Sequence, residues 1–278
     1  MYIDNEGPNL PRRVHYLQPA YRPAVILLHS SMAGAKQWAA LSGELEQRFR
    51  IQAIDLLGYG DTPPWQGDGS PSLDDYADLV AASIPPRARN VIVIGHSLGG
   101  AVAMRVAQRE PGRVSRLVLI EPSLFSLLPA SGRFGAFSEI AMLAGETLRT
   151  LGSDPARAAA CFIDYWCGRG SWDGMPERRR ASVLASIGQL RCEWPAVLQG
   201  STDLAELQAT LPTNTLLMRF EQTLRPSREV AEILADAFPC WQLATVRDAG
   251  HMGPLTHPHL VNPIVREFLA DARSARAA

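Results

Sequence analysis

Residues 89–102 constrain the fold of this chain more than any other stretch. Val91 to Ile94 form an apolar, β-branched run, which predicts a strand buried on both faces. From Leu98 to Arg109, small and apolar residues recur at helical spacing, which predicts a helix. Between the two, residues 95–99 read Gly-His-Ser-Leu-Gly and match the pattern G-x-S-x-G. The chain must therefore turn sharply here from a strand into a helix.

Ser97 stands at the centre of this turn and is the candidate nucleophile. A strand-to-helix turn this tight holds its central residue in strained backbone geometry, and a Cβ at either flanking glycine would collide with a neighbouring element. The hydroxyl would project from the carboxyl end of a central strand, above the free N–H groups of a helix N-terminus. A five-residue pattern can arise by chance, but the flanking strand and helix favour catalysis.

Composition and charge limit the classes of function. With 278 residues, of which 46% are hydrophobic, the chain can bury a large core as one domain or as one domain with an insertion. A net charge of −1 offers no basic surface for nucleic acid or an anionic membrane, so we expect a small-molecule substrate. The N-terminus lacks the features of an export signal, and no apolar run approaches 18 residues. These features predict a soluble, cytoplasmic protein.

The cysteines predict neither a zinc site nor a redox motif, because the four of them form no C-x-x-C pair. Reduced thiols are the simplest interpretation, and a disulfide among Cys161, Cys167 and Cys192 stays open.

Strand-like and helix-like segments alternate along most of the chain. Strands are predicted near 13–17 and at 24–28, 49–56, 91–94, 116–120, 214–219 and 241–246. Helices are predicted at 36–48, 73–84, 98–109 and 260–273. Such alternation at short intervals indicates an α/β protein with a parallel sheet and helices on both faces. Ligands then gather at the carboxyl ends of the strands, where Ser97 and Glu121 would share one edge.

A serine hydroxyl needs an imidazole to take its proton, and that imidazole needs a carboxylate to hold its tautomer. His251 is the candidate base, because it follows the last predicted strand in an Ala-Gly-His context and lies after Ser97 in the chain.

The order of these parts resembles the α/β-hydrolase superfamily, in particular its serine hydrolases with a helical cap. The G-x-S-x-G turn looks like the family's nucleophile elbow, and residues 29–31 resemble its H-G-x segment, which supplies an oxyanion donor. The resemblance implies that Ser31 and Leu98 donate the backbone N–H groups of the oxyanion hole. Ser30 replaces the family's glycine, which leaves the first donor open between Ser31 and Met32.

The resemblance also implies a division of the chain. A mostly parallel central sheet with helices on both faces would form a core from residues 1–122 and 209–278. A helical cap, inserted after the sixth strand of the family's fold, would comprise residues 123–208, which contain aromatic residues and no strand-like run. Such a cap roofs the active site, and its apolar character favours a hydrophobic substrate.

The identity of the catalytic acid is open at this point. The commonest family arrangement has an aspartate after the seventh strand, but Thr223 stands at the corresponding place. A second arrangement, resembling haloalkane dehalogenases and zearalenone lactonases, takes the acid from the end of the sixth strand, where Glu121 lies. We favour Glu121, with Glu221 as the alternative and Asp248 behind both.

The sequence therefore predicts a serine hydrolase that cleaves a carboxylic ester or lactone through an acyl-serine, without a metal or organic cofactor. Alternatives with the same residues are C–C bond hydrolysis, thioester hydrolysis and acyl transfer, and a rival from another class is a catalytically silent ligand-binding protein. Association is left open by the sequence, with a homodimer as one arrangement.

Overall fold

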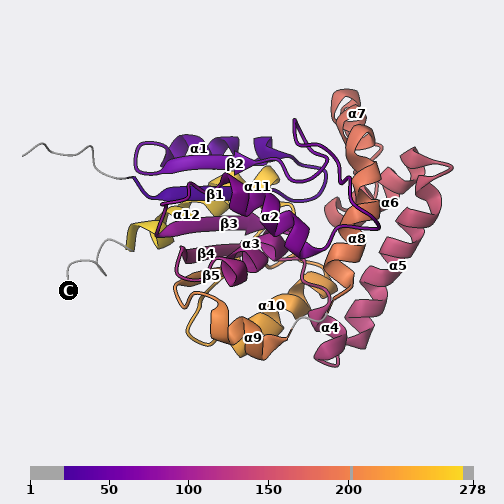
Figure 1. Ribbon diagram of the computed structural model, residues 1–278. Helices are drawn as coiled ribbons and strands as arrows, with labels where there is room; N and C mark the ends of the chain where they lie inside the picture. The colour runs from indigo at the N-terminus through magenta and orange to yellow at the C-terminus, as the bar shows by residue number, and fades with distance from the viewer. Residues whose placement is uncertain (1–21, 201–202, 272–278) are drawn as a thin grey trace, which may run out of the picture.

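A computed structural model describes residues 22–200 and 203–271 (Figure 1). The strand predicted near residues 13–17 lies outside the described residues. The other predicted strands are all present in one parallel sheet, in the order β2-β1-β3-β4-β5-β6. Their bounds are β1 Ala24–Leu28, β2 Arg50–Ile54, β3 Val91–His96, β4 Val114–Ile120, β5 Thr215–Phe220 and β6 Gln242–Val246.

The central strands are buried, as their continuous apolar runs predict. Every residue of β1 and of β3 is buried, because helices cover both faces of the sheet. Most of the helical elements on one face contribute to a hydrophobic cluster with Leu41, Val261 and Phe268. They are η1 Ala35–Trp38, α1 Ala39–Leu45, α11 Gly253–Thr256 and α12 Pro258–Asp271.

The opposite face is covered by α2 Leu73–Ser83, α3 Leu98–Arg109 and α10 Arg225–Ala237, with α9 Leu204–Thr210 against α3. The hydrophobic cluster on this face continues into the other helices between β4 and β5. These lie together at one side of the sheet in Figure 1. They are α4 Leu127–Ala130, α5 Phe134–Leu151, α6 Pro155–Cys167, α7 Glu177–Ser186, η2 Ile187–Gln189 and α8 Leu190–Leu198. The α/β-hydrolase fold predicted from the sequence is confirmed.

Strand register sets the position of the site. His96 pairs with Ile120 across β3 and β4, so Ser97 and Glu121, the next residue of each strand, emerge side by side at the same edge. Phe220 and Val246 end the paired segments of β5 and β6, and His251 follows shortly after. Three chain segments that are distant in sequence therefore converge at the carboxyl ends of the strands.

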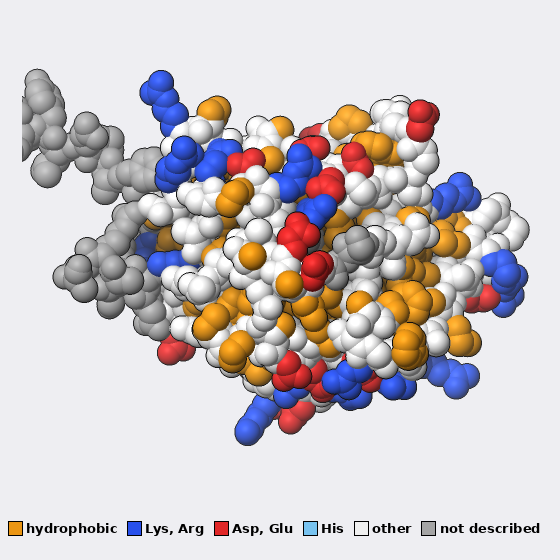
Figure 2. Space-filling model, turned by 60° about the horizontal axis from the view of Figure 1, so that its bottom comes forward, with side chains coloured by type: hydrophobic (Ala, Val, Ile, Leu, Met, Phe, Trp, Pro, Cys, Tyr) orange, Lys and Arg blue, Asp and Glu red, His pale blue; other side chains and the backbone are white. Residues whose placement is uncertain are grey.

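The surface shows no large area of one charge sign on the face in Figure 2, where Lys and Arg intermingle with Asp and Glu. Among the described residues, no helix combines the length and the apolar composition that crossing a lipid bilayer requires.

Close backbone approach explains the glycines of the turn. A Cβ on Gly99 would lie 2.3 Å from the carbonyl oxygen of Leu28, and one on Gly95 would lie 2.1 Å from the carbonyl oxygen of Gly99. Both obstacles are backbone atoms, which a rotamer change cannot move.

Gly99→Ala is therefore expected to lower the free energy of unfolding by about 3 kcal/mol or more, since β1 and α3 would have to separate. Urea denaturation measures this change. The matched control is Gly145→Ala in α5, where a Cβ meets no atom within 4 Å and should stabilise the helix by about 0.5–1 kcal/mol. Equal stability of the Gly99 variant and the wild type would contradict this reading of the turn.

Candidate active site

Ser97 occupies the turn between β3 and α3 in a conformation that is rare for a residue with a side chain. Its φ of 56° and ψ of −119° lie outside the helical and extended regions. The backbone N–H of Ser97 donates to the Ile120 carbonyl at 3.0 Å, which ties the turn to β4. The residue is 6% exposed, so its hydroxyl faces the interior of a pocket instead of bulk water.

The structure brings Ser97, His251 and Glu121 into one hydrogen-bonded chain. His251 Nε2 lies 3.0 Å from Ser97 Oγ, and His251 Nδ1 lies 2.7 Å from Glu121 Oε2. A carboxylate only accepts, so Nδ1 carries the proton and Nε2 is free to accept from the serine hydroxyl. His251 is 3% exposed and Glu121 is fully buried, which strengthens both contacts.

Glu121 is held from two further sides. Its Oε1 accepts from the Phe220 N–H at 2.8 Å, and its Oε2 accepts from the Thr223 hydroxyl at 2.8 Å. Thr223 is the residue at the position where the commonest family arrangement has its aspartate. By contrast, the structure does not bring the alternative acids to His251, because Glu221 and Asp248 are both exposed.

The loop after β1 presents a free amide toward this site. Met32, and not Ser30, takes the left-handed conformation, with φ of 61°. The Met32 N–H donates to the Tyr59 hydroxyl at 3.1 Å and the Ser30 N–H donates to Gln37 Oε1 at 3.0 Å. Within the described chain, the N–H groups of Ser31 and Leu98 have no acceptor.

A buried polar chain connects this loop with the loop of His251. The Ser30 hydroxyl donates to Gln37 Oε1 at 2.9 Å, and the Gln37 amide lies 3.2 Å from His96 Nδ1. His96 Nε2 donates to the His251 carbonyl at 2.8 Å. Burial, and then the neighbouring His251, lower the pKa of His96 well below its usual value, so the ring stays neutral. Sequence reasoning missed Gln37, which belongs to no motif.

His29 supports the same loop. Its Nδ1 donates to the Ser30 carbonyl at 2.8 Å, and its Nε2 accepts from the Leu56 N–H at 3.0 Å. Burial lowers the pKa of His29 to about 4, which keeps the imidazole neutral. Both ring nitrogens are occupied, so this histidine cannot take a proton from a nucleophile.

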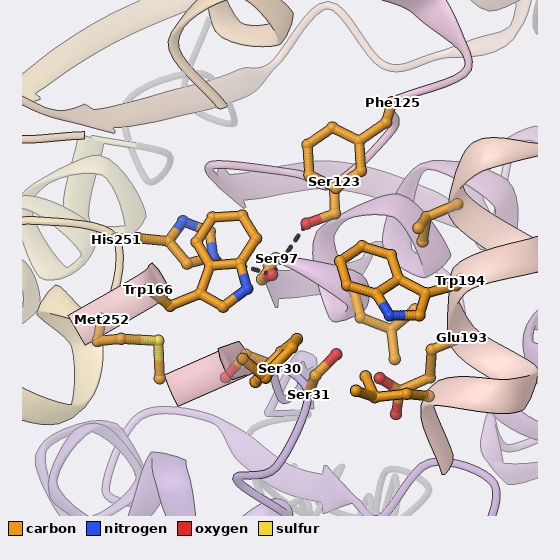
Figure 3. Close-up of a pocket in the computed structure, with 14 residues that line it drawn as sticks. Ser30, Ser31, Ser97, Ser123, Phe125, Trp166, Glu193, Trp194, His251 and Met252 are labelled. Atoms are coloured by element: carbon orange, nitrogen blue, oxygen red, sulfur yellow. Dashed lines mark hydrogen bonds between the residues drawn. The ribbon is translucent and has the colours of Figure 1, made fainter. Parts of the chain in front are cut away.

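The pocket above Ser97 has mostly apolar walls (Figure 3). Ser123 Oγ lies 2.9 Å from Ser97 Oγ, and the Trp166 ring lies over His251 with 4.2 Å between the ring centroids. The other apolar lining comes largely from the segment between β4 and β5: Phe125, Phe162, Leu190, Trp194 and Val197.

Glu193 of α8 is the one carboxyl among these lining residues, and sequence reasoning missed it. It is 2% exposed, and the Tyr59 hydroxyl donates to its Oε1 at 2.5 Å. Burial raises the pKa of Glu193 to about 7, although the Ser31 and Tyr59 hydroxyls act in the opposite direction. The only signal in the sequence is a glutamate within an otherwise mostly apolar helix.

Neither metal ligands nor disulfides contribute to the described part of the chain. The residues that the structure describes contain no group of three or more His, Cys, Asp or Glu side chains that could hold a metal ion. Cys161, Cys167, Cys192 and Cys240 are all free thiols.

Comparison with known proteins places this arrangement in a family. The chain is 29% identical over 265 residues to a pimeloyl-(acyl-carrier protein) methyl ester esterase of Aromatoleum aromaticum, covering 88% of this chain and 99% of that protein. A solved hydrolase from Pseudomonas aeruginosa superposes with a TM-score of 0.73 at 25% identity, covering 90% of this chain and 91% of that one. A thermophilic esterase from Thermogutta terrifontis, at 23% identity and a TM-score of 0.72, shares the fold over 90% of each chain.

The model of the alpha/beta hydrolase family matches residues 25–264, a span that contains the turn at Ser97, the end of β4 and the loop of His251. This chain therefore belongs to the α/β hydrolase family and is a hydrolase.

Proposed function

We propose that this protein is a serine hydrolase that cleaves a carboxylic ester or lactone of a small hydrophobic substrate through an acyl-serine intermediate. The observation that carries the proposal is the hydrogen-bonded chain from Ser97 through His251 to Glu121. His251 Nε2 lies 3.0 Å from Ser97 Oγ, and His251 Nδ1 lies 2.7 Å from Glu121 Oε2. Its geometry matches what nucleophilic catalysis by a serine requires: a base within reach of the hydroxyl, and a carboxylate that orients the base.

In this mechanism Ser97 Oγ attacks the acyl carbon while His251 Nε2 takes the hydroxyl proton. The carboxylate of Glu121 stabilises the imidazolium that forms, and the same proton then passes from His251 to the leaving alkoxide. Water, deprotonated by His251, attacks the acyl-serine and releases the acid, which restores the free hydroxyl. Every step is a proton transfer or an acyl transfer, so none calls for a metal or an organic cofactor.

The oxyanion of each tetrahedral intermediate would accept from the N–H groups of Ser31 and Leu98. The hydrogen bonds of the neighbouring amides support this assignment. The Ser30 N–H donates to Gln37 and the Met32 N–H donates to Tyr59, so neither of these two amides is available to the oxyanion. Two fixed backbone donors of this kind stabilise negative charge as it develops, and do so at little reorganisation cost.

Residues 123–208 would act as the cap over this site and residues 1–122 with 209–278 as the core. The aromatic wall contributed by Phe125, Phe162 and Trp194 favours a substrate with a hydrophobic part. Ester cleavage is also the activity named for the relative from Aromatoleum aromaticum, which is aligned over nearly its full length.

Ser97→Ala is expected to lower kcat/KM for p-nitrophenyl butanoate by about ten-thousandfold, because the attacking oxygen is lost. Ser138→Ala, which changes an exposed serine on α5, is the control and should match the wild type. Steady-state release of p-nitrophenol measures both. If the wild-type protein turned over no acyl substrate, a silent ligand-binding protein would replace the proposed enzyme.

The role of Glu121 is tested by exchanging the two candidate acids for amides. Glu121→Gln should lower kcat by roughly a hundredfold to ten-thousandfold, because an amide does not stabilise the imidazolium and can impose the wrong tautomer. Glu221→Gln should stay within about twofold of the wild type, since that side chain is exposed. Full kcat in the Glu121 variant would remove this residue from the mechanism.

A further inference from the structure

The pocket contains one carboxyl group that the proposed mechanism does not use, Glu193. Its side chain extends from α8 toward Ser31 (Figure 3), whose hydroxyl acts on the carboxyl, and its Oε1 accepts a hydrogen bond from the Tyr59 hydroxyl. Oε2 is closed off from solvent and has no hydrogen-bond partner among the described residues. A buried polar atom without a partner is costly, and native proteins rarely leave one without a reason.

The surroundings of Oε2 favour a partner that donates a hydrogen bond. Among the described residues, no Lys or Arg lines the pocket, so none of them places a cation beside the carboxyl there. The two nearby hydroxyls, those of Tyr59 and Ser31, both favour the ionised form of Glu193, and the Met32 N–H donates in turn to the Tyr59 oxygen. Burial has the larger effect and raises the pKa of Glu193 to about 7, so the carboxyl is a pure acceptor, with Oε2 unpartnered within the described chain, above this pH.

The position of Glu193 indicates which part of a substrate it would meet. The leaving oxygen has to lie near His251 Nε2 in order to receive its proton. In Figure 3, Glu193 and Trp194 lie on the side of Ser97 away from His251. The substrate part that remains bonded to Ser97 is the acyl part, and with the leaving oxygen beside His251 the acyl part would lie on this side.

We propose that Glu193 Oε2 binds a hydrogen-bond donor, a hydroxyl or an ammonium group, on the acyl part of the ester. This inference rests on the proposed acyl-serine mechanism and adds the specificity of that same site. Glu193 is then a specificity-determining residue: the apolar walls bind the carbon chain, and the carboxylate selects chains that carry a donor.

The groups around Glu193 allow its ionisation to be followed by pH. Tyr59 and Tyr76 face it from the loop after β2 and from α2, and Cys192 is its neighbour on α8. Burial raises the pKa values of both tyrosines and of Cys192, so all three stay neutral through the neutral range. His251 lines the same pocket, but it takes part in the cleavage of every ester. Its effect on kcat/KM therefore cancels in the ratio of two esters.

The test uses p-nitrophenyl esters with one leaving group and matched acyl chains. Butanoate ends in a methyl group, 3-hydroxypropanoate in a hydroxyl, and 3-aminopropanoate in an ammonium group. The heptanoate, 6-hydroxyhexanoate and 6-aminohexanoate esters repeat the comparison at greater reach. The measured quantity is the ratio of kcat/KM for a donor ester to that for its methyl-ended partner.

Glu193→Gln should lower this ratio at least tenfold for the preferred donor, because the substituted amide loses the charge and can turn an N–H group toward the substrate. The control is Glu139→Gln, which alters a second carboxyl–tyrosine pair, with Tyr165, outside the pocket. It should leave the ratio unchanged. Comparison of the hydroxyl and ammonium series decides which donor is preferred.

The pH dependence of the wild-type ratio provides a test that does not depend on a variant folding. An ionised acceptor predicts that the ratio rises severalfold between about pH 6 and pH 8, as Glu193 loses its proton. A ratio that falls over this range, or one that stays near unity for both donors at both lengths, would overturn the proposal. Failure of the serine mechanism itself would instead appear as retained butanoate hydrolysis in Ser97→Ala.

Discussion

The hydrogen bond between His251 Nδ1 and Glu121 is the interaction on which the site depends. It joins the end of β4 to a loop that follows β6, 130 residues further along the chain. The bond fixes the tautomer of the imidazole, and the tautomer decides whether Nε2 can accept from Ser97. The parallel register makes this contact available, because it delivers the ends of β3 and β4 to the same edge. The sheet register therefore also determines which hydrogen bonds His251 can make.

One buried hydrogen-bond network holds two loops at the edge of the sheet, the loop after β1 and the loop of His251. Gln37 Oε1 accepts hydrogen bonds from the N–H and the hydroxyl of Ser30, and the Gln37 amide N–H donates to His96. His96 in turn donates to the His251 carbonyl. Buried side chains thus position the loop after β1 and the loop of His251 relative to each other. Such a network preorganises a site without contributing a reactive group.

Much of this arrangement follows from local sequence, because its determinants lie within a few residues of one another. The turn at Ser97 is predictable from two glycines between a β-branched run and a helical segment. The placement of Glu121 at the edge shared with Ser97 follows from strand alternation, and Thr223, which marked the missing aspartate, donates a hydrogen bond to that glutamate. The loop after β1 has its left-handed residue at Met32, so the serine at position 30, where the family has a glycine, does not need a positive φ.

The hydrogen-bond partners of Glu193 and Gln37 could not be predicted from the sequence, for a physical reason. Tyr59 and Glu193 are separated by 134 residues and meet only because α8 packs over the loop after β2. No local pattern encodes a contact between an inserted helix and a core loop, and burial of a glutamate is the opposite of what its hydrophilicity suggests.

The contact between the Trp166 and His251 rings joins the apolar wall of the pocket to the hydrogen-bonded chain at Ser97. The indole belongs to α6, whereas the imidazole belongs to the core, and their centroids are 4.2 Å apart. Any displacement of α6 would uncover the face of the imidazole and admit water beside it. The volume of the pocket and the hydration of His251 would then change together.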